Sequence, residues 1–246
     1  MIKINANKIA MYLTWSLMGQ VISLLISTPG HTAEGDLYDF LWLDQDKKIY
    51  VLQNKVYEKK GSFYANAGLV FGLGNEFQDT SGAHLSFGYY FREEWAFEVF
   101  AQKYENSNTE SYKNLERING SVPFVRRFDQ VIAAGVVWSP FYGKINTFNK
   151  IFYFDWSIGA SLGSIKAESN AKNAAFKSRA DLFESESFTA GIIKTSLRFH
   201  ATKNIHVDLQ YMNTSYKAPG PTVGGIPGEE KFRSNADLIL SVGFSF

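Results

Sequence analysis

The stretch LILSVGFSF at residues 238–246 decides the fold of this chain. Large apolar side chains stand at every second position from Leu238 to Phe246, and the positions between them are mostly small or polar. Successive side chains of an extended strand point to opposite faces, so a period of two gives one apolar face and one polar face. The stretch therefore predicts a β-strand with one oily side.

Seven earlier segments repeat this alternation. They lie at about residues 62–74, 82–92, 95–105, 131–139, 152–163, 186–200 and 205–215, and the closing segment begins near residue 232. Segments of about this length suit strands that cross a membrane at a tilt, and an even number suits a single-chain bacterial barrel. A sheet edge left open in hydrocarbon would expose unpaired backbone groups, so the sheet has to close. We predict an all-β fold, an eight-stranded antiparallel up-and-down transmembrane β-barrel over residues 62–246.

The charged residues indicate which face of each strand points into the barrel. A Lys or Arg on the lipid side near mid-membrane costs about 2–4 kcal/mol. We therefore expect a polar network in the lumen, formed by Asn66, Arg92, Glu98, Gln102, Asp155, Lys194, Arg198, Asp208, Gln210 and Asp237. An eight-stranded barrel is just wide enough for side chains to fill, which favours paired charges over an open pore. A soluble β-sandwich also alternates, but it leaves the many Phe and Trp residues of the oilier face unexplained.

The two ends of the chain indicate export. Lys3 and Lys8 precede an apolar run and a small-residue site at Ala33, which predicts a signal peptide over residues 1–33. A transmembrane helix is the rival interpretation, but polar residues dilute the run. The last strand resembles the closing strand of bacterial outer-membrane barrels. That resemblance implies that Leu240, Val242, Phe244 and Phe246 form the signal read by the barrel-assembly machinery.

Composition agrees with this location. Aromatic residues make up 16% of the chain, and there is no Cys, so neither disulfides nor a lipid-anchored cysteine are expected. The formal charge of +1 falls by two, to −1, when Lys3 and Lys8 leave with the signal peptide. No basic excess points to nucleic-acid binding. Residues 34–61 are polar and aromatic and are expected to form a periplasmic N-terminal extension, whose runs at 41–43 and 48–52 have a composition that would dock a partner or fill the lumen.

The connections alternate in length. Residues 93–94 and 202–204 make short joins, whereas residues 106–130, 166–185 and 217–231 are long and polar. Barrels have short periplasmic turns and long outer loops, so this order of connections fits a periplasmic N-terminus. Two connections depart from this pattern. The first outer loop is short, and the join at residues 140–150 is long enough for a small helix.

Two stretches carry a resemblance to a known family. Residues 51–57 (VLQNKVY) and 138–144 (WSPFYGK), the latter followed by FDWSIGA at residues 154–160, resemble a family of outer-membrane β-barrel-domain proteins of myxobacterial and Bdellovibrio-type bacteria. The resemblance covers about residues 36–246 and implies a small OmpA-like barrel. Members of that family are mostly unassigned in function, and they provide no catalytic residues to carry over.

Catalytic and metal-binding patterns are weak. His84 and Ser86 share a strand face, but they lie about 7 Å apart along the strand, too far for a direct hydrogen bond. His200 and His206 flank a short turn, where a polar filler or rim role is expected. We therefore expect no catalytic residues, no cofactor and no metal site.

Three functions follow from the sequence, in order of preference. The first is a structural or interaction role in the cell envelope, in which outer-membrane lipid surrounds the barrel and an envelope protein binds residues 34–61 or the outer loops. The second is a narrow channel for ions or small solutes. The third is a lipid-modifying enzyme that uses His84.

Overall fold

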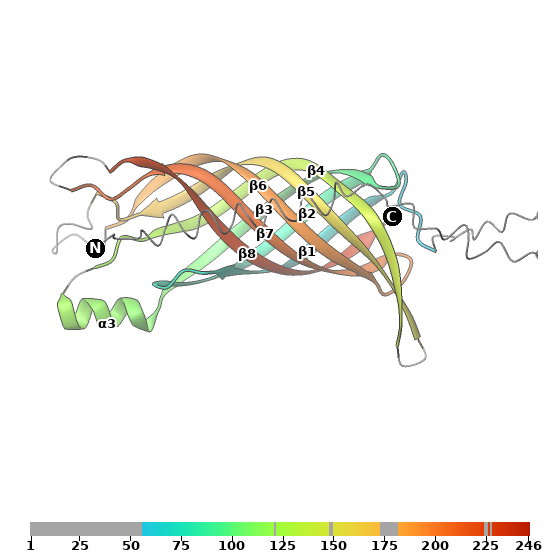
Figure 1. Ribbon diagram of the computed structural model, residues 1–246, viewed down its shortest axis with the longest axis horizontal. Helices are drawn as coiled ribbons and strands as arrows, with labels where there is room; N and C mark the ends of the chain where they lie inside the picture. Colours follow the sequence, from blue (N-terminus) through green and yellow to red (C-terminus); the bar gives the residue numbers. More distant parts are fainter. Residues whose placement is uncertain (1–55, 121, 148–149, 173–181, 224–225, 227) are drawn as a thin grey trace, which may run out of the picture. The chain divides into compact units, whose positions relative to one another are not determined.

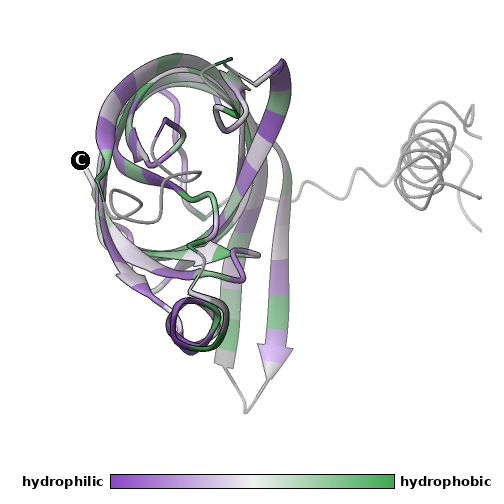
Figure 2. Ribbon diagram, turned by 90° about the vertical axis from the view of Figure 1, so that its left-hand side faces the viewer, coloured by the Kyte–Doolittle hydropathy of each residue, from purple (hydrophilic) through white to green (hydrophobic). Residues whose placement is uncertain are grey.

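The computed structural model describes residues 56–246 except 121, 148–149, 173–181, 224–225 and 227. The predicted signal peptide and residues 34–55 of the predicted extension lie outside the described residues. Eight strands form a closed antiparallel barrel in chain order. They are β1 (Phe63–Leu73), β2 (Gln78–Tyr90), β3 (Trp95–Asn108), β4 (Arg126–Thr147), β5 (Lys150–Ser169), β6 (Glu184–His200), β7 (Ile205–Pro219) and β8 (Glu230–Ser245). Figure 1 shows the tilted strands from the side, and Figure 2 shows the closed ring along the barrel axis.

The ring closes where the predicted last strand meets the first. β1 and β8 pair without a break from Tyr64↔Ser245 to Leu73↔Ala236. Beyond that ladder, the backbones of Phe63 and Phe246 exchange two hydrogen bonds of 2.8 and 2.9 Å. The predicted all-β, eight-stranded up-and-down barrel is therefore confirmed, and no sheet edge is left open along this seam.

The two ends of the barrel differ. We call the end that carries Phe63 and Phe246 the terminal end, and the opposite end, with the connections after β1, β3, β5 and β7, the loop end. The connection after β3 contains the helix α3 (Glu110–Asn119), which was not predicted. Thr109 caps its start through its side chain, and Gly120 ends it in the left-handed conformation, with φ of 57°. No helix among the described residues is long and apolar enough to cross a membrane.

The long β4–β5 connection is a hairpin and not the small helix that its length would allow. β4 continues past Pro140 to Thr147, and β5 returns from Lys150. The pairing shifts register between Trp138 and Phe141, which places Pro140 at a bulge. A bulge tolerates proline because the ladder is already interrupted there. The hairpin extends beyond the ring at the terminal end, as Figure 1 shows.

Side chains fill the lumen in two regions. A polar and aromatic region lies toward the terminal end and includes the buried Tyr64, Tyr90 and Val137. An apolar cluster lies toward the loop end and draws residues from every strand except β2. Its members include Val70, Phe100, Val131, Ile165, Ile192, Met212, Tyr216 and Ile239.

Candidate functional site

The polar region of the lumen is built around two ion pairs. Arg198 on β6 donates two parallel hydrogen bonds to Asp208 on β7, each 2.9 Å long. This fork geometry gives the strongest arginine–carboxylate contact. The guanidinium also lies 4.4 Å from the ring centre of Tyr64, a cation–π contact.

Glu98 and Lys194 form the second pair, across the lumen between β3 and β6. Both side chains are almost completely buried, with 3% and 4% exposed. The hydroxyl group of Tyr64 donates a 2.7 Å hydrogen bond to the other oxygen of Glu98. Gly159 leaves room for the lysine, since a Cβ there would lie 2.9 Å from its methylene carbons. Each charge is therefore paired, as burial requires.

A segment before the first strand closes the terminal mouth. We call residues 56–62 the strap. The ammonium group of Lys59 donates a 2.9 Å hydrogen bond to Asp155, whose other oxygen lies 2.8 Å from Nε2 of His200. The ring of Tyr57 stacks on that histidine, with centroids 4.7 Å apart. The strap backbone is also tied down, because the amides of Lys59 and Lys60 donate to one oxygen of Glu93 at 3.0 and 3.1 Å.

The polar groups nearer the loop end lie beside the apolar cluster. The hydroxyl group of Tyr104 donates to Asp237 at 2.9 Å and contacts the side-chain oxygen of Gln102 at 2.8 Å. Asn235 also donates to Asp237. Gln210 is buried, and its side-chain oxygen has no hydrogen-bond partner among the described residues.

Nine of the ten side chains predicted for the lumen network are buried there, and Arg92 is the exception. Arg92 is exposed in the turn between β2 and β3. The chain leaves the strand after Tyr90, so the alternation that would have turned Arg92 inward ends before it. The prediction for Arg92 is therefore wrong, because a period of two applies only while the backbone stays extended.

The histidine and serine on β2 do not form a catalytic pair. The hydroxyl group of Ser86 accepts a 3.0 Å hydrogen bond from Asn66. His84 is buried beside Phe100, and neither ring nitrogen has a hydrogen-bond partner among the described residues. A nucleophile needs a base within reach, so this arrangement does not support an enzyme based on His84.

Sequence reasoning missed several members of the network. Nothing in the sequence marked Lys59 as a lumen residue, because it precedes the first alternating segment. Tyr64 and Tyr90 were detectable, since both stand on the inward phase of their strands. The sequence predicts only a filler or rim role for His206, but its ring contacts Asn66 at 2.8 Å and Ser245 at 3.3 Å.

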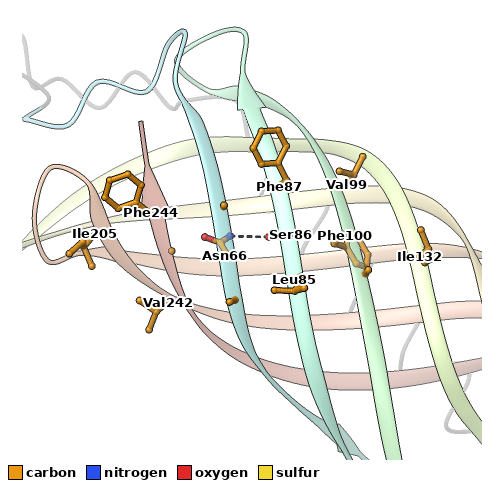
Figure 3. A pocket seen from close by; sticks show the side chains of 14 residues that line it. Asn66, Leu85, Ser86, Phe87, Val99, Phe100, Ile132, Ile205, Val242 and Phe244 are labelled. Atoms are coloured by element: carbon orange, nitrogen blue, oxygen red, sulfur yellow. Dashed lines mark hydrogen bonds between the residues drawn. The ribbon is translucent and has the colours of Figure 1, made fainter.

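The outside of the barrel is an apolar belt. The four residues predicted as the assembly signal point outward, and Leu240, Val242, Phe244 and Phe246 are 50–60% exposed. A groove of about 620 Å³ runs over the outer face near β1 (Figure 3), with Val242 and Phe244 of β8 on one side of β1 and Leu85 and Phe87 of β2 on the other. An apolar outer belt around a closed ring of antiparallel strands is the pattern of an outer-membrane barrel. The protein is thus an outer-membrane β-barrel embedded in lipid.

No protein-family model and no curated protein matches the chain. Solved structures of three small barrels are similar to it. Ail, the attachment invasion locus protein of Yersinia pestis, has a TM-score of 0.40 and 17% sequence identity, and the match covers 76% of this chain and 99% of that chain. The N-terminal barrel domain of Pseudomonas aeruginosa OprF has a TM-score of 0.45 and 12% identity, with 76% of this chain and 98% of that chain covered. Neisserial surface protein A has a TM-score of 0.42 and 15% identity, with the same two coverages of 76% and 98%. At 17% identity or less, such a likeness concerns the fold alone.

Proposed function

We propose that this outer-membrane barrel has a structural and interaction role in the cell envelope and that it does not conduct solutes. The observation that carries the proposal is the filled lumen. An apolar cluster with residues from seven strands occupies one half, and fully paired buried charges occupy much of the other. Packed apolar side chains such as Phe100, Met212 and Ile239 leave no space in this cross-section for water or ions. The functional surfaces are then the two ends.

The terminal end faces the periplasm in this proposal. Its connections are short, apart from the β4–β5 hairpin, whereas the loop end carries α3 and the longer connections, as barrels place them. The strap ties the chain to the terminal mouth through Asp155 and Glu93. In this proposal the segment 34–55 acts in the periplasm.

The β4–β5 hairpin supports the interaction role. Between Phe141 and Phe152 its two strands pair only with each other, since β3 pairs with β4 no further than Trp138 and β6 pairs with β5 only from Tyr153 onward. Phe141, Ile145 and Ile151 are about half exposed on this extension. A two-stranded hairpin with exposed apolar residues is marginal alone and is stabilised by contact with a partner or the membrane surface.

Partner capture tests where the envelope protein binds. The full chain and a variant that lacks residues 34–55 would be cross-linked in native membranes and purified, and a third variant would have α3 replaced by a Gly/Ser linker of equal length. We expect an envelope protein that is lost with residues 34–55 and retained in the α3 variant. If the same proteins are recovered from all three, residues 34–55 are not the binding segment, and if none is recovered from the full chain, the interaction role is wrong.

Conductance recording tests the closed lumen. We expect purified protein in planar bilayers to give no resolved current steps, and reproducible steps would refute the proposal in favour of a channel.

Recognition by the barrel-assembly machinery is part of the same proposal. Phe246→Ala should lower the amount of folded protein in the outer membrane, whereas an unchanged amount would refute this role of the terminal aromatic. Membership of the myxobacterial and Bdellovibrio-type family is also proposed, on residues 51–57 and 138–144.

A further inference from the structure

Three side chains at the terminal end of the lumen contact one another in the order serine, histidine, asparagine. The hydroxyl oxygen of Ser245 lies 3.3 Å from Nδ1 of His206. The other ring nitrogen, Nε2, lies 2.8 Å from the side-chain oxygen of Asn66. The three residues come from β8, β7 and β1, which are neighbours where the barrel closes.

The orientation of the Asn66 side chain sets which histidine nitrogen carries the proton. The amide nitrogen of Asn66 donates to Ser86, and its side-chain oxygen faces His206. A carbonyl oxygen only accepts hydrogen bonds, so Nε2 has to carry the proton. Nδ1 is then left as an acceptor, and the hydroxyl group of Ser245 is its donor. This is the tautomer that a general base needs beside a serine.

The strands are built so that these groups can approach. A Cβ at Gly243 on β8 would overlap both the oxygen of Asn66 and the ring of His206. Asn66 and His206 are buried, whereas Ser245 is partly exposed and lines a pocket of about 370 Å³ at the terminal mouth. The attacking group therefore lies outermost and the orienting group deepest, as in other sets of nucleophile, base and orienting residue.

We propose that Ser245, His206 and Asn66 form a hydrolytic site for carboxylic esters, an activity separate from the interaction role. The hydroxyl oxygen of Ser245 attacks the carbonyl carbon, and its proton passes to Nδ1 of His206. That proton then leaves with the alcohol as the ester bond breaks, which gives an acyl-serine. Water attacks the acyl group in the same way, releases a carboxylic acid and restores the serine. Asn66 holds the imidazole in the required tautomer.

The pocket lining indicates the kind of ester. Lys60 and Lys203 line the same pocket together with Glu58, and neither lysine ammonium group has a hydrogen bond or ion pair among the described residues. Val56 and Phe246 add apolar surface. An ester with a short acyl group and an anionic substituent such as a phosphate matches both features, because the ammonium groups would hold the anion beside the serine.

Serine-directed labelling tests the site directly. The full chain, purified in detergent, would be treated with a fluorophosphonate probe, and the modified peptide would be identified by mass spectrometry. We expect the label on Ser245, and its amount to fall at least about 10²-fold in His206→Gln. Absence of label from Ser245 in folded protein would overturn the proposal.

Ester hydrolysis supplies the second measurement, with 4-nitrophenyl butyrate as a neutral substrate and 1-butyryl-glycerol 3-phosphate as an anionic one. Ser245→Ala should abolish turnover of both, and Lys203→Glu should reduce turnover of the anionic ester more than that of the neutral one. Ser157→Ala is the matched control, since this buried serine bonds Ser196 instead. Heat-modifiable migration on gels confirms that each variant is folded. Turnover that survives in Ser245→Ala would overturn the proposal even if a partner is captured.

Discussion

The buried pair between Glu98 and Lys194 gives the sharpest test of how the lumen is stabilised. Lys194→Met keeps most of the length of the side chain but removes its charge, and it leaves Glu98 buried without its ion-pair partner. The hydroxyl group of Tyr64 remains as a donor to that carboxylate. Removing one member of a buried pair costs about 3–5 kcal/mol. Because one hydrogen bond to the carboxylate survives, we expect the lower end of that range for the free energy of unfolding.

The double variant Glu98→Gln/Lys194→Met separates the lost ion pair from the stranded charge. It leaves no buried charge at this position, and the side-chain oxygen of Gln at 98 can still accept from Tyr64. Replacing a buried ion pair by neutral groups is often close to neutral in stability. We therefore expect the double variant to recover most of the loss.

The assay is urea unfolding in detergent micelles, followed by tryptophan fluorescence and by migration on gels. Lys103→Met is the control, since Lys103 pairs with Asp129 on the exposed outer surface. Exposed pairs contribute about 0–1 kcal/mol, so this change should have little effect. If Lys194→Met costs no more than Lys103→Met, or if the two lumen substitutions add independently, the reasoning about a paired, dry lumen is refuted.

Two further predictions concern packing and lipid contact. Gly88→Ala should destabilise the barrel by about 1–3 kcal/mol, because the new methyl group would overlap the ring of Tyr64. Gly191→Ala is the control, since a methyl group there meets open space and should leave the unfolding free energy nearly unchanged in the same assay. Equal effects of the two substitutions would contradict the packing argument. Leu240→Arg should cost about 2–4 kcal/mol, since it places a charge within the apolar outer belt. Unchanged urea midpoints and unchanged yields in the membrane would contradict the outward orientation of β8.

The sequence predicted the barrel well because alternation is a local property. The two faces of each strand follow from its own sequence, so the inward side chains of Glu98, Lys194 and Asp155 could be assigned without knowing which strands pair with theirs. The closing strand was the most secure, since its apolar residues alternate without interruption to Phe246. Failures occurred where alternation stops. Arg92 lies just beyond the end of β2. At Pro140 a bulge interrupts the alternation, although β4 continues beyond it.

The contacts across the lumen could not be predicted, because they depend on the stagger of the strands. Lys59 reaches Asp155 across 96 residues of sequence, and Lys194 is equally far from Glu98. Neither pairing follows from strand order alone. The stagger of the closed ring determines which inward side chains share a level, and one residue of slippage in any ladder would reassign every partner. The capping residues Thr109 and Gly120 were a readable signal for α3, but they were hidden in a connection assumed to be irregular.

The division of the lumen into a polar half and an apolar half has a consequence for how the protein works. The apolar cluster and the buried side chains beside it fill the lumen toward the loop end, so a ligand at the terminal mouth has no open path to the other side. Events at the two ends can then be coupled only through the wall of the barrel. Because every strand is paired on both sides, the wall is stiff, and local changes in the strap should remain local. Breaking the contact of Lys59 with Asp155 should therefore increase hydrogen exchange of residues 56–62 and leave that of α3 unchanged. Increased exchange in α3 would show that the two ends communicate.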